Sequence, residues 1–184
     1  MGGSLTEQEI YDIKARGSPY SEIENFVETG TYKAETTLMA AKHFKNVYTM
    51  EIYEPLYKES MERANDEKVN NINFYLGDSL DCLPEIALKV RVGAIYFIDA
   101  HISGGDSSWN GKNRVPLIEE LDIIISEPIG PSVFILDDLR LWKTIKAWDW
   151  EHITNESIIK KLKDKGIKIA SYFEQNDRFF VFTK

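Results

Sequence analysis

Acidic residues recur at the ends of short apolar runs in this 184-residue chain. Glu28, Glu51 and Asp99 each end such a run, and Gly77-Asp78 and Asp137-Asp138 end two others. In an open α/β sheet, ligands bind at the edge where the carboxyl ends of the parallel strands meet. Carboxylates placed there can accept hydrogen bonds from ligand hydroxyls, hold a hard cation or take part in proton transfer. The pattern therefore predicts an acidic ligand-binding edge.

The elements that must position these residues alternate between strand and helix. Apolar runs predict strands over residues 26–28, 47–52, 72–76, 94–98 and 133–136, and a carboxyl-terminal hairpin of strands 167–173 and 178–182 joined by residues 174–177. Helical spacing predicts helices over 34–44, 55–68, 116–126 and 155–163, and a further helix capped by Ser79 that contains Leu80, Leu83 and Ile86. This order predicts an α/β fold with a mostly parallel seven-stranded sheet, an antiparallel carboxyl-terminal hairpin and helices on both faces.

Composition limits the classes of protein that fit. Hydrophobic residues make up 43% of the chain, enough for the core of one domain, expected over residues 21–184 behind an amino-terminal extension of residues 1–20. The first four residues resemble a cloning remnant, so the natural chain could be longer or have several domains. The net charge of −8 argues against nucleic acid as the main partner and leaves open a small or neutral substrate such as a sugar or a phenol. A homo-oligomer is a further alternative.

Two further observations bear on location. Cys82 is the only cysteine, so no internal disulfide can form, which favours a reducing compartment and a cytoplasmic localisation. No apolar run approaches the roughly 20 residues that a membrane-spanning helix needs, so no membrane partner is expected.

The segment after the first predicted strand has the features of an adenosine site. Gly30 allows a tight turn and a close approach of the backbone to a ligand. Glu51 follows 21 residues later, at the spacing where a carboxylate accepts hydrogen bonds from ribose hydroxyls. The run lacks the full G-x-G-x-x-G set that a dinucleotide pyrophosphate requires, so NAD is disfavoured and an adenosine ligand without phosphates is favoured.

At these residues the chain resembles the class I S-adenosylmethionine-dependent methyltransferases. Their first motif, E-x-G-x-x-x-G-x-T, is matched by Glu28-x-Gly30-x-x-x-Ala34-x-Thr36, with Ala34 in place of a glycine, and the resemblance spans residues 22–184. It implies that Glu28 and Gly30 lie near the amino-acid end of the cofactor, that Glu51 binds its ribose, and that Asp78 and Ser79 flank its adenine. The implied cofactor-binding residues are Glu28, Thr29, Gly30, Thr31, Tyr32, Thr36, Glu51, Ile52, Gly77, Asp78, Ser79 and Asp99.

Segments 96–105 and 134–138 resemble the metal-dependent sugar O-methyltransferases that tailor macrolide and aminocoumarin sugars. By this resemblance Asp99, Asp137 and Asp138 hold Mg²⁺ or Mn²⁺, with Asp99 counted also as catalytic. His101 stands where those enzymes usually place an aspartate general base. Magnesium prefers hard carboxylate oxygens and lowers the pKa of a bound hydroxyl, and histidine can take up a proton near neutral pH. The resemblance implies methyl transfer from S-adenosylmethionine to a hydroxyl of a sugar or glycan.

Other interpretations of these residues remain open. Asp137-Asp138 could form a helix cap with a solvated neighbour, and His101 could bond a loop carbonyl, which would suit a metal-independent methyltransferase of small molecules. A nucleotide-sugar or dinucleotide oxidoreductase and a non-catalytic binding module are further alternatives. His43, His152 and Cys82 are interpreted as structural.

Two segments outside the motifs each have a functional and a structural interpretation. The loop 103–114, with two glycines and Trp109, suits a lid over a sugar ring, although it could be a surface connection. The tryptophan-rich segment 142–150 could form a second wall of the site, or serve packing or oligomer contacts.

Overall fold

Seven strands form one sheet in the computed structural model, which describes residues 3–101, 111–142 and 150–184. The strand order across the sheet is β3-β2-β1-β4-β5-β7-β6. The strands are β1 (Asn25–Thr29), β2 (Asn46–Glu51), β3 (Ile72–Leu76), β4 (Ile95–Ile98), β5 (Val133–Leu136), β6 (Ile169–Gln175) and β7 (Arg178–Thr183).

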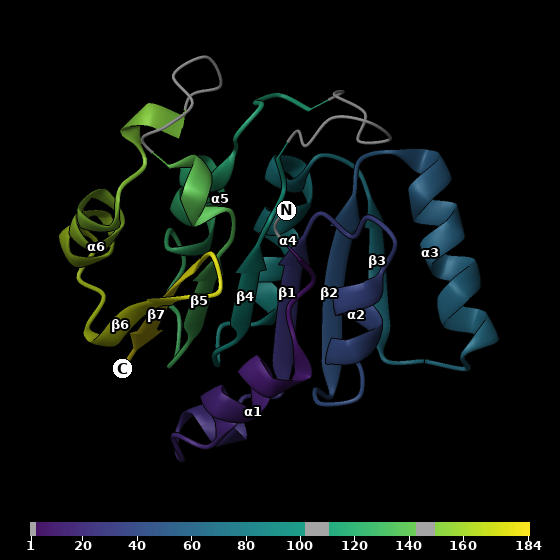
Figure 1. Cartoon of the computed structure of the whole chain (residues 1–184), viewed down its shortest axis with the longest axis horizontal. Coiled ribbons are helices and arrows are strands. Elements are labelled where there is room, and N and C mark those ends of the chain that lie inside the picture. Colours follow the sequence, from purple (N-terminus) through teal and green to yellow (C-terminus); the bar gives the residue numbers. More distant parts are fainter. Residues whose placement is uncertain (1–2, 102–110, 143–149) are drawn as a thin grey trace.

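The first five strands are parallel, and the order of strands reverses between β1 and β4. Strand β7 lies antiparallel between β5 and β6, and β6 forms that edge of the sheet (Figure 1). Thr29 pairs with Met50 of β2 and with Ile98 of β4, and Ile98 pairs with Leu136 of β5. The residues that follow these strands therefore meet at one edge, beside the reversal of strand order. The predicted fold class is confirmed.

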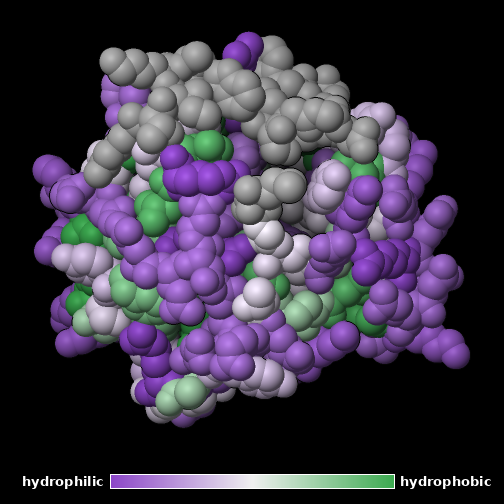
Figure 2. Space-filling view, viewed as in Figure 1, coloured by the Kyte–Doolittle hydropathy of each residue, from purple (hydrophilic) through white to green (hydrophobic). Residues whose placement is uncertain are grey.

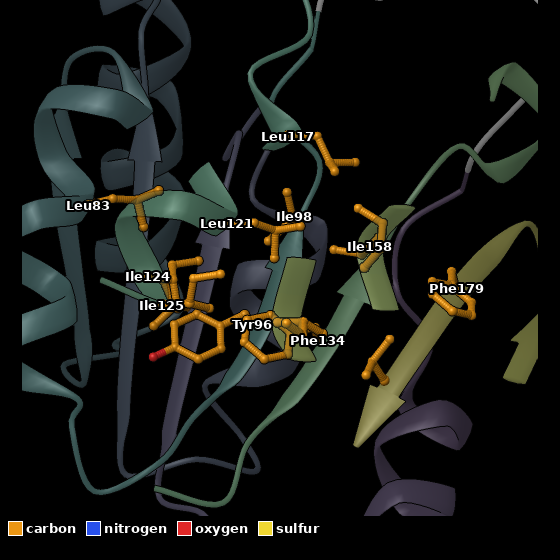
Figure 3. Close-up of a cluster of buried hydrophobic side chains, with 14 of the residues drawn as sticks. Leu83, Tyr96, Ile98, Leu117, Leu121, Ile124, Ile125, Phe134, Ile158 and Phe179 are labelled. Atoms are coloured by element: carbon orange, nitrogen blue, oxygen red, sulfur yellow. The ribbon is translucent and has the colours of Figure 1, made fainter. Parts of the chain in front are cut away.

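Helices cover both faces of the sheet. They are α1 (Glu7–Lys14), α2 (Glu35–Ala40), α3 (Glu54–Asp66), α4 (Ser79–Lys89), α5 (Leu117–Ile124) and α6 (Asn155–Asp164), with short 3-10 helices η1 (Tyr20–Glu22), η2 (Leu139–Leu141) and η4 (Trp150–His152). On one face, α4, α5 and α6 pack on alternate residues of the strands, including Tyr96, Ile98 and Phe134 (Figure 3). On the other face, α1 and α2 pack on the residues between them, such as Ile95 and Phe97. Both sides of β4 and β5 are thus buried, which explains their apolar sequences.

The amino-terminal residues pack on the same core. Leu5, Ile10 and Ile13 are buried in the cluster that also contains Phe26 of β1 and Phe180 of β7. Helix α1 begins with a capping box in which Thr6 and Glu9 satisfy each other's backbone N–H groups. Glu9 and Ile13 of α1 line a small cavity together with Phe173 of β6 and Phe180 and Phe182 of β7.

Three local predictions were wrong in detail. Asp78, not Ser79, caps α4: its side chain accepts the N–H of Leu80 at 2.8 Å, and Ser79 is the first helical residue. The hairpin turn is two residues shorter than predicted, because Asn176 and Asp177 both take positive φ, a two-residue turn whose twist matches the strands. Helix α2 stops at Ala40 and leaves residues 41–43 in turns.

The outer surface is polar, as the many charged residues of the chain predict. The face seen in Figure 2 is mostly hydrophilic, with apolar residues scattered over it. Within the described ranges, none of the helices has both the length and the apolar character needed to cross a membrane.

Candidate functional site

A cavity of about 670 Å³ opens at the carboxyl edge of the sheet. Its volume falls within the range of small-molecule sites, roughly 300–1,000 Å³. Fourteen of the residues predicted for cofactor, metal or catalysis line it, whereas Thr29 is buried beneath it. The lining ones are Glu28, Gly30, Thr31, Tyr32, Thr36, Glu51, Ile52, Gly77, Asp78, Ser79, Asp99, His101 and the pair Asp137-Asp138.

The turn after β1 contains three residues with positive φ, Gly30, Tyr32 and Ala34. Gly30 has φ of +86°, and a Cβ there would lie 3.1 Å from the carbonyl oxygen of Asp99, so glycine is required. Ala34 stands where the resembling motif has glycine and takes a left-handed φ of 60°. Its methyl group is buried against Leu38 and Ala64, and this packing offsets part of the cost of the strained backbone.

Glu28 lies in the floor of the cavity with almost no exposure. Thr37 Oγ1 donates to its Oε2, and Thr49 Oγ1 donates to the same atom at 2.7 Å. Burial raises the pKa of Glu28 to about 7, and these two hydrogen bonds limit the rise. A carboxyl group held in this way can accept a hydrogen bond from a cationic ammonium group in the cavity.

Glu51 is fixed by two backbone donors. The N–H of Tyr32 donates to its Oε2 at 2.8 Å, and the N–H of Tyr53 donates to its Oε1 at 2.9 Å. Burial raises the pKa of Glu51, partly offset by these backbone bonds. Its carboxylate is therefore preorganised at the end of β2, facing the cavity.

Asp78 joins the turn after β3 to the described end of the loop 103–114. Its Oδ1 caps α4, and its Oδ2 accepts the backbone N–H of Lys112 at 2.6 Å. Gly111, Asn113 and Arg114 line the same cavity. The rest of the predicted lid, including Trp109, lies outside the described residues.

His101 lies between two carboxylates. Its Nε2 is 2.6 Å from Asp138 Oδ2, and its Nδ1 is 3.5 Å from Asp99 Oδ1. The edge of the imidazole meets the ring of Trp150 at a centroid distance of 5.2 Å. Asp138 has a left-handed φ of 57°, and Arg140 pairs with its other oxygen. Strained backbone of this kind persists where surrounding contacts hold it, as in ligand sites.

The carboxyl groups of this cluster differ in electrostatics. Burial raises the pKa of Asp99 well above its ordinary value, and the charges of Asp137 and Asp138 raise it further. Burial would also raise the pKa of Asp138, but the hydrogen bond and charge of His101, with Arg140, bring it below the ordinary value. One oxygen of Asp99, one nitrogen of His101 and one oxygen of Asp138 lie within 4.8 Å of one another, close enough to share a cation.

Asp137 faces a different partner. Its Oδ1 lies 2.9 Å from Arg178 Nε, outside the line of the Nε–H bond, so the contact is an ion pair rather than a hydrogen bond. Burial raises the pKa of Asp137 to about 6, and the charge of Arg178 limits the rise. Arg178 also binds Glu9 of α1 and donates to the carbonyl of Gly3. The predicted metal ligands are thus divided, with Asp99 and Asp138 beside His101 and Asp137 beside Arg178.

Sequence reasoning missed three functional candidates. Arg178 is the first residue of β7, in which every residue is buried, and Glu120 lies on the buried face of α5. In both cases the sequence carried a signal, which was a charged residue at a position where an apolar one is expected. Arg140, which lines the cavity and pairs with Asp138 and Asp177, gave no such signal. Gly3 and Ser4 also line the cavity, next to Glu35, which accepts a hydrogen bond from Ser4.

The ends of the tryptophan-rich segment belong to the core. Trp142 and Trp150 are both buried in the cluster under α5 and α6, so packing accounts for these two residues and neither is a wall of the cavity. Residues 143–149 lie outside the described residues.

Solved structures that share this fold include several methyltransferases. No family model and no curated protein matches the chain. The O-methyltransferase TomG of Streptomyces achromogenes, involved in tomaymycin synthesis and solved with S-adenosylmethionine, is similar in structure, with a TM-score of 0.64 and 13% identity over 98% of this chain and 81% of its own. An S-adenosylmethionine-dependent methyltransferase of Clostridium acetobutylicum has a TM-score of 0.63 and 9% identity, over 98% of this chain and 92% of its own.

A ribosomal protein L11 methylase of Lactobacillus delbrueckii shares the fold too, with a TM-score of 0.54 and 15% identity over 100% of this chain and 80% of its own. The names of the first and third of these proteins refer to different roles, tomaymycin synthesis and methylation of a ribosomal protein, and the name of the second gives no acceptor. The shared fold therefore does not identify the acceptor of this chain, which has to be argued from the site.

Proposed function

We propose that this protein is an S-adenosylmethionine-dependent O-methyltransferase that acts on a hydroxyl of a sugar or glycan, with His101 as general base and a divalent cation at Asp99 and Asp138. One observation carries the proposal. The residues of the glycine turn, Glu51 and Asp78 line the same cavity as the His101 cluster. A single cavity thus has room for a cofactor at one end and an acceptor at the other. The methyltransferase folds of the similar structures support this division.

The proposed cofactor contacts use groups that the protein already holds in place. Glu51, fixed by two backbone N–H groups, accepts hydrogen bonds from the ribose hydroxyls. Gly30 lets the backbone approach the amino-acid end, where Glu28 and Asp99 supply negative charge for the ammonium group. Asp78 and Ser79 flank the adenine. S-adenosylmethionine supplies an electrophilic methyl group on a cationic sulfur, and much of the rate would come from orienting it toward the acceptor oxygen.

The proposed base is oriented by a carboxylate. Asp138 Oδ2 lies 2.6 Å from His101 Nε2, which assigns the proton of neutral imidazole to Nε2 and leaves the lone pair on Nδ1. Nδ1 faces Asp99, and an acceptor hydroxyl placed beside both groups can give its proton to Nδ1 as its oxygen attacks the methyl carbon. The bond from that carbon to sulfur breaks, and S-adenosylhomocysteine leaves. Trp150 packs against one side of the ring.

The donor atoms fit a divalent cation. Carboxylate oxygens of Asp99 and Asp138 suit Mg²⁺ or Mn²⁺, and a cation there would offset the burial and the neighbouring negative charges that raise the pKa of Asp99. Such an ion would polarise the acceptor hydroxyl. Asp137 as a third ligand stays a proposal, because its ion pair with Arg178 competes with that role.

Transfer of label from S-adenosyl[methyl-³H]methionine to a panel of nucleotide sugars, oligosaccharides and phenols tests the proposal. Methylation of a sugar hydroxyl that is lost with EDTA and restored by Mg²⁺ or Mn²⁺ supports it. Activity that survives exhaustive chelation would show the metal-independent alternative, and transfer to phenols alone would contradict the sugar acceptor.

Cofactor binding should depend on Glu51. Its two hydrogen bonds to ribose involve a charged acceptor, for which losses of roughly 1.5–3 kcal/mol are typical. We expect Glu51→Ala to weaken S-adenosylhomocysteine binding at least about tenfold in calorimetry. Glu54→Gln is the matched control, since Glu54 is an exposed carboxylate three residues away that does not line the cavity. Equal affinities in the two variants would remove Glu51 from the site.

The cation should depend on Asp138. Asparagine tolerates the left-handed backbone of this residue, so Asp138→Asn removes charge with little change of shape. We expect Mn²⁺ binding, followed by electron paramagnetic resonance, to weaken at least about tenfold, the scale seen for altered metal sites, while S-adenosylhomocysteine affinity stays within twofold. Asp177→Asn is the control, because Asp177 also has positive φ and pairs with Arg140. Unchanged Mn²⁺ affinity in Asp138→Asn would contradict the proposed ligand.

A further inference from the structure

Glu120 is a fully buried carboxyl group that the proposed chemistry does not use. It shares the buried face of α5 with Leu117, Leu121 and Ile124, where an apolar side chain would avoid the cost of desolvation. In the part of the chain that the structure describes, its Oε1 has no hydrogen-bond partner. A polar group kept at such a position calls for an explanation.

The other oxygen of Glu120 is connected to the site through Thr29. Thr29 Oγ1 donates to Glu120 Oε2 at 3.3 Å. The backbone N–H groups of Asp99 and Ala100 donate to the same hydroxyl oxygen at 3.1 and 3.2 Å. A threonine hydroxyl has one proton and two lone pairs. Because both lone pairs receive N–H groups, its proton must point to another acceptor, and Glu120 supplies it.

The two N–H groups belong to the turn that carries the proposed catalytic residues. Asp99 and Ala100 follow β4 directly, and the N–H of His101 donates to the carbonyl of Asp99 at 3.1 Å. The same carbonyl lies 3.1 Å from where a Cβ of Gly30 would be, so this turn packs on the glycine turn. A shift of the Asp99 turn would therefore move His101 relative to the cofactor side of the cavity.

The charge state of Glu120 suits this arrangement. Burial raises its pKa to about 8, although hydrogen bonds with Ser79 and Thr29 limit the rise. The carboxyl group is then largely neutral near pH 7. A glutamine amide is neutral as well, has nearly the same shape and keeps a carbonyl oxygen as acceptor. If Glu120 acts only as an acceptor for the Thr29 hydroxyl, glutamine should therefore replace it with little effect.

We propose that Glu120 is a positioning residue: its carboxyl group fixes the Thr29 hydroxyl and through it holds the Asp99–His101 turn against the glycine turn. Only the expected effect of Glu120 on methyl transfer rests on the proposed function. The hydrogen bonds from Asp99 and Ala100 to Thr29 can be followed without a cofactor or an acceptor.

Hydrogen exchange of the backbone amides in the full chain tests it directly. In Glu120→Met, which keeps the packing and removes the acceptor, the Asp99 and Ala100 amides should exchange at least about tenfold faster relative to the amide of Phe97 in β4. Glu120→Gln should stay within twofold of the parent. Ile124→Ala is the matched control, because Ile124 is equally buried on α5 and belongs to the apolar core. It should lower Tm without a selective change at Asp99 and Ala100.

A second pair of variants covers the case in which Glu120→Met does not fold. Thr29→Val should reproduce the selective loss of protection, and Thr29→Ser, which keeps the hydroxyl, should restore it. Where methyl transfer is measurable, Glu120→Met should lower kcat more than it raises KM for S-adenosylmethionine.

The outcomes separate this proposal from the proposed function. Faster exchange that spreads over the whole sheet in proportion to the fall in Tm, as in Ile124→Ala, would overturn the positioning role. So would Thr29→Val with unchanged exchange at Asp99 and Ala100. A selective effect in a parent chain that binds no S-adenosylhomocysteine would support the positioning role while contradicting the proposed function.

Discussion

Replacing Arg178 with methionine should destabilise the fold by about 3–5 kcal/mol, the loss typical when one partner of a buried ion pair is removed. Arg178 is 3% exposed, and its Nη1 lies 3.0 and 3.1 Å from the two carboxylate oxygens of Glu9. Its Nε lies 2.9 Å from Asp137 Oδ1. Methionine fills much of the same volume but leaves both carboxylates buried without a cation. For a chain of this size, a fall in Tm of roughly 6–20 °C is expected in calorimetry.

The pH dependence gives a second readout of the same variant. Asp137 has a pKa of about 6 in the folded chain against an ordinary value of 3.8, so the folded state binds the extra proton between these values and its stability falls as pH rises through them. Without Arg178 the pKa of Asp137 rises further, and this loss extends to higher pH. The stability difference between parent and Arg178→Met should therefore be larger at pH 7.5 than at pH 5.

Arg91→Met is the control for removing a guanidinium group. Arg91 forms an exposed ion pair with Glu127, and such pairs contribute about 0–1 kcal/mol. The double variant Arg178→Met with Glu9→Gln should recover part of the loss, because one stranded carboxylate is gone. An Arg178→Met protein that melts within about 2 °C of the parent would show that water or protonation relieves both carboxylates.

His101→Ala should lower turnover by about 10²- to 10⁴-fold, the usual contribution of a positioned general base. The parent rate should rise with pH to a plateau, since the base must be neutral to take the proton, and this dependence should be lost in the variant. His101→Asp should keep more activity than His101→Ala, because a carboxylate stands at this position in the enzymes that the sequence resembles. The measurement is kcat at saturating S-adenosylmethionine across the pH range.

Mn²⁺ affinity distinguishes a base from a metal ligand. His101 shares the cluster with Asp99 and Asp138, so either role is geometrically open. As a base, His101→Ala should leave Mn²⁺ affinity within twofold while turnover falls; a parallel loss of both would make His101 a ligand. His43→Ala is the control, because His43 is 12% exposed against 10% for His101 and also pairs with a carboxylate, Glu7, at 2.8 Å. If His101→Ala and His101→Asp both turn over like the parent, His101 is not the base and serves only to anchor the loop.

Much of the architecture follows from local sequence. Central strands such as β4, apolar at every position, must be covered on both faces, which selects a parallel sheet with helices on either side. Because the carboxyl ends of these strands meet at one edge, residues after different strands could be assigned to one site before their contacts were known. Glu28, Glu51, Asp78 and Asp99 line one cavity for this reason.

The exact ends and caps of helices and strands were harder to predict from the sequence, because each depends on the backbone conformation of one or two residues. The left-handed Asn176 and Asp177 allow a two-residue turn, and a longer turn would have suited the same residue types. Asp78 and Ser79 are both good caps, and Asp78 takes the role because its backbone is extended while Ser79 is already helical.

The sequence by itself determined which residue types meet at the carboxyl edge, but only the tertiary structure decided which of them pair. Asp137 and Asp138 are neighbours in the chain, yet Asp137 meets Arg178 of β7 and Asp138 meets His101. Arg178 in turn meets Glu9, 169 residues away in sequence. Strand and helix patterns arise from interactions among near neighbours, so they leave a periodic trace in the sequence. The partner of a buried charge comes from a distant segment brought near by packing, and its residue type alone carries no record of that partner.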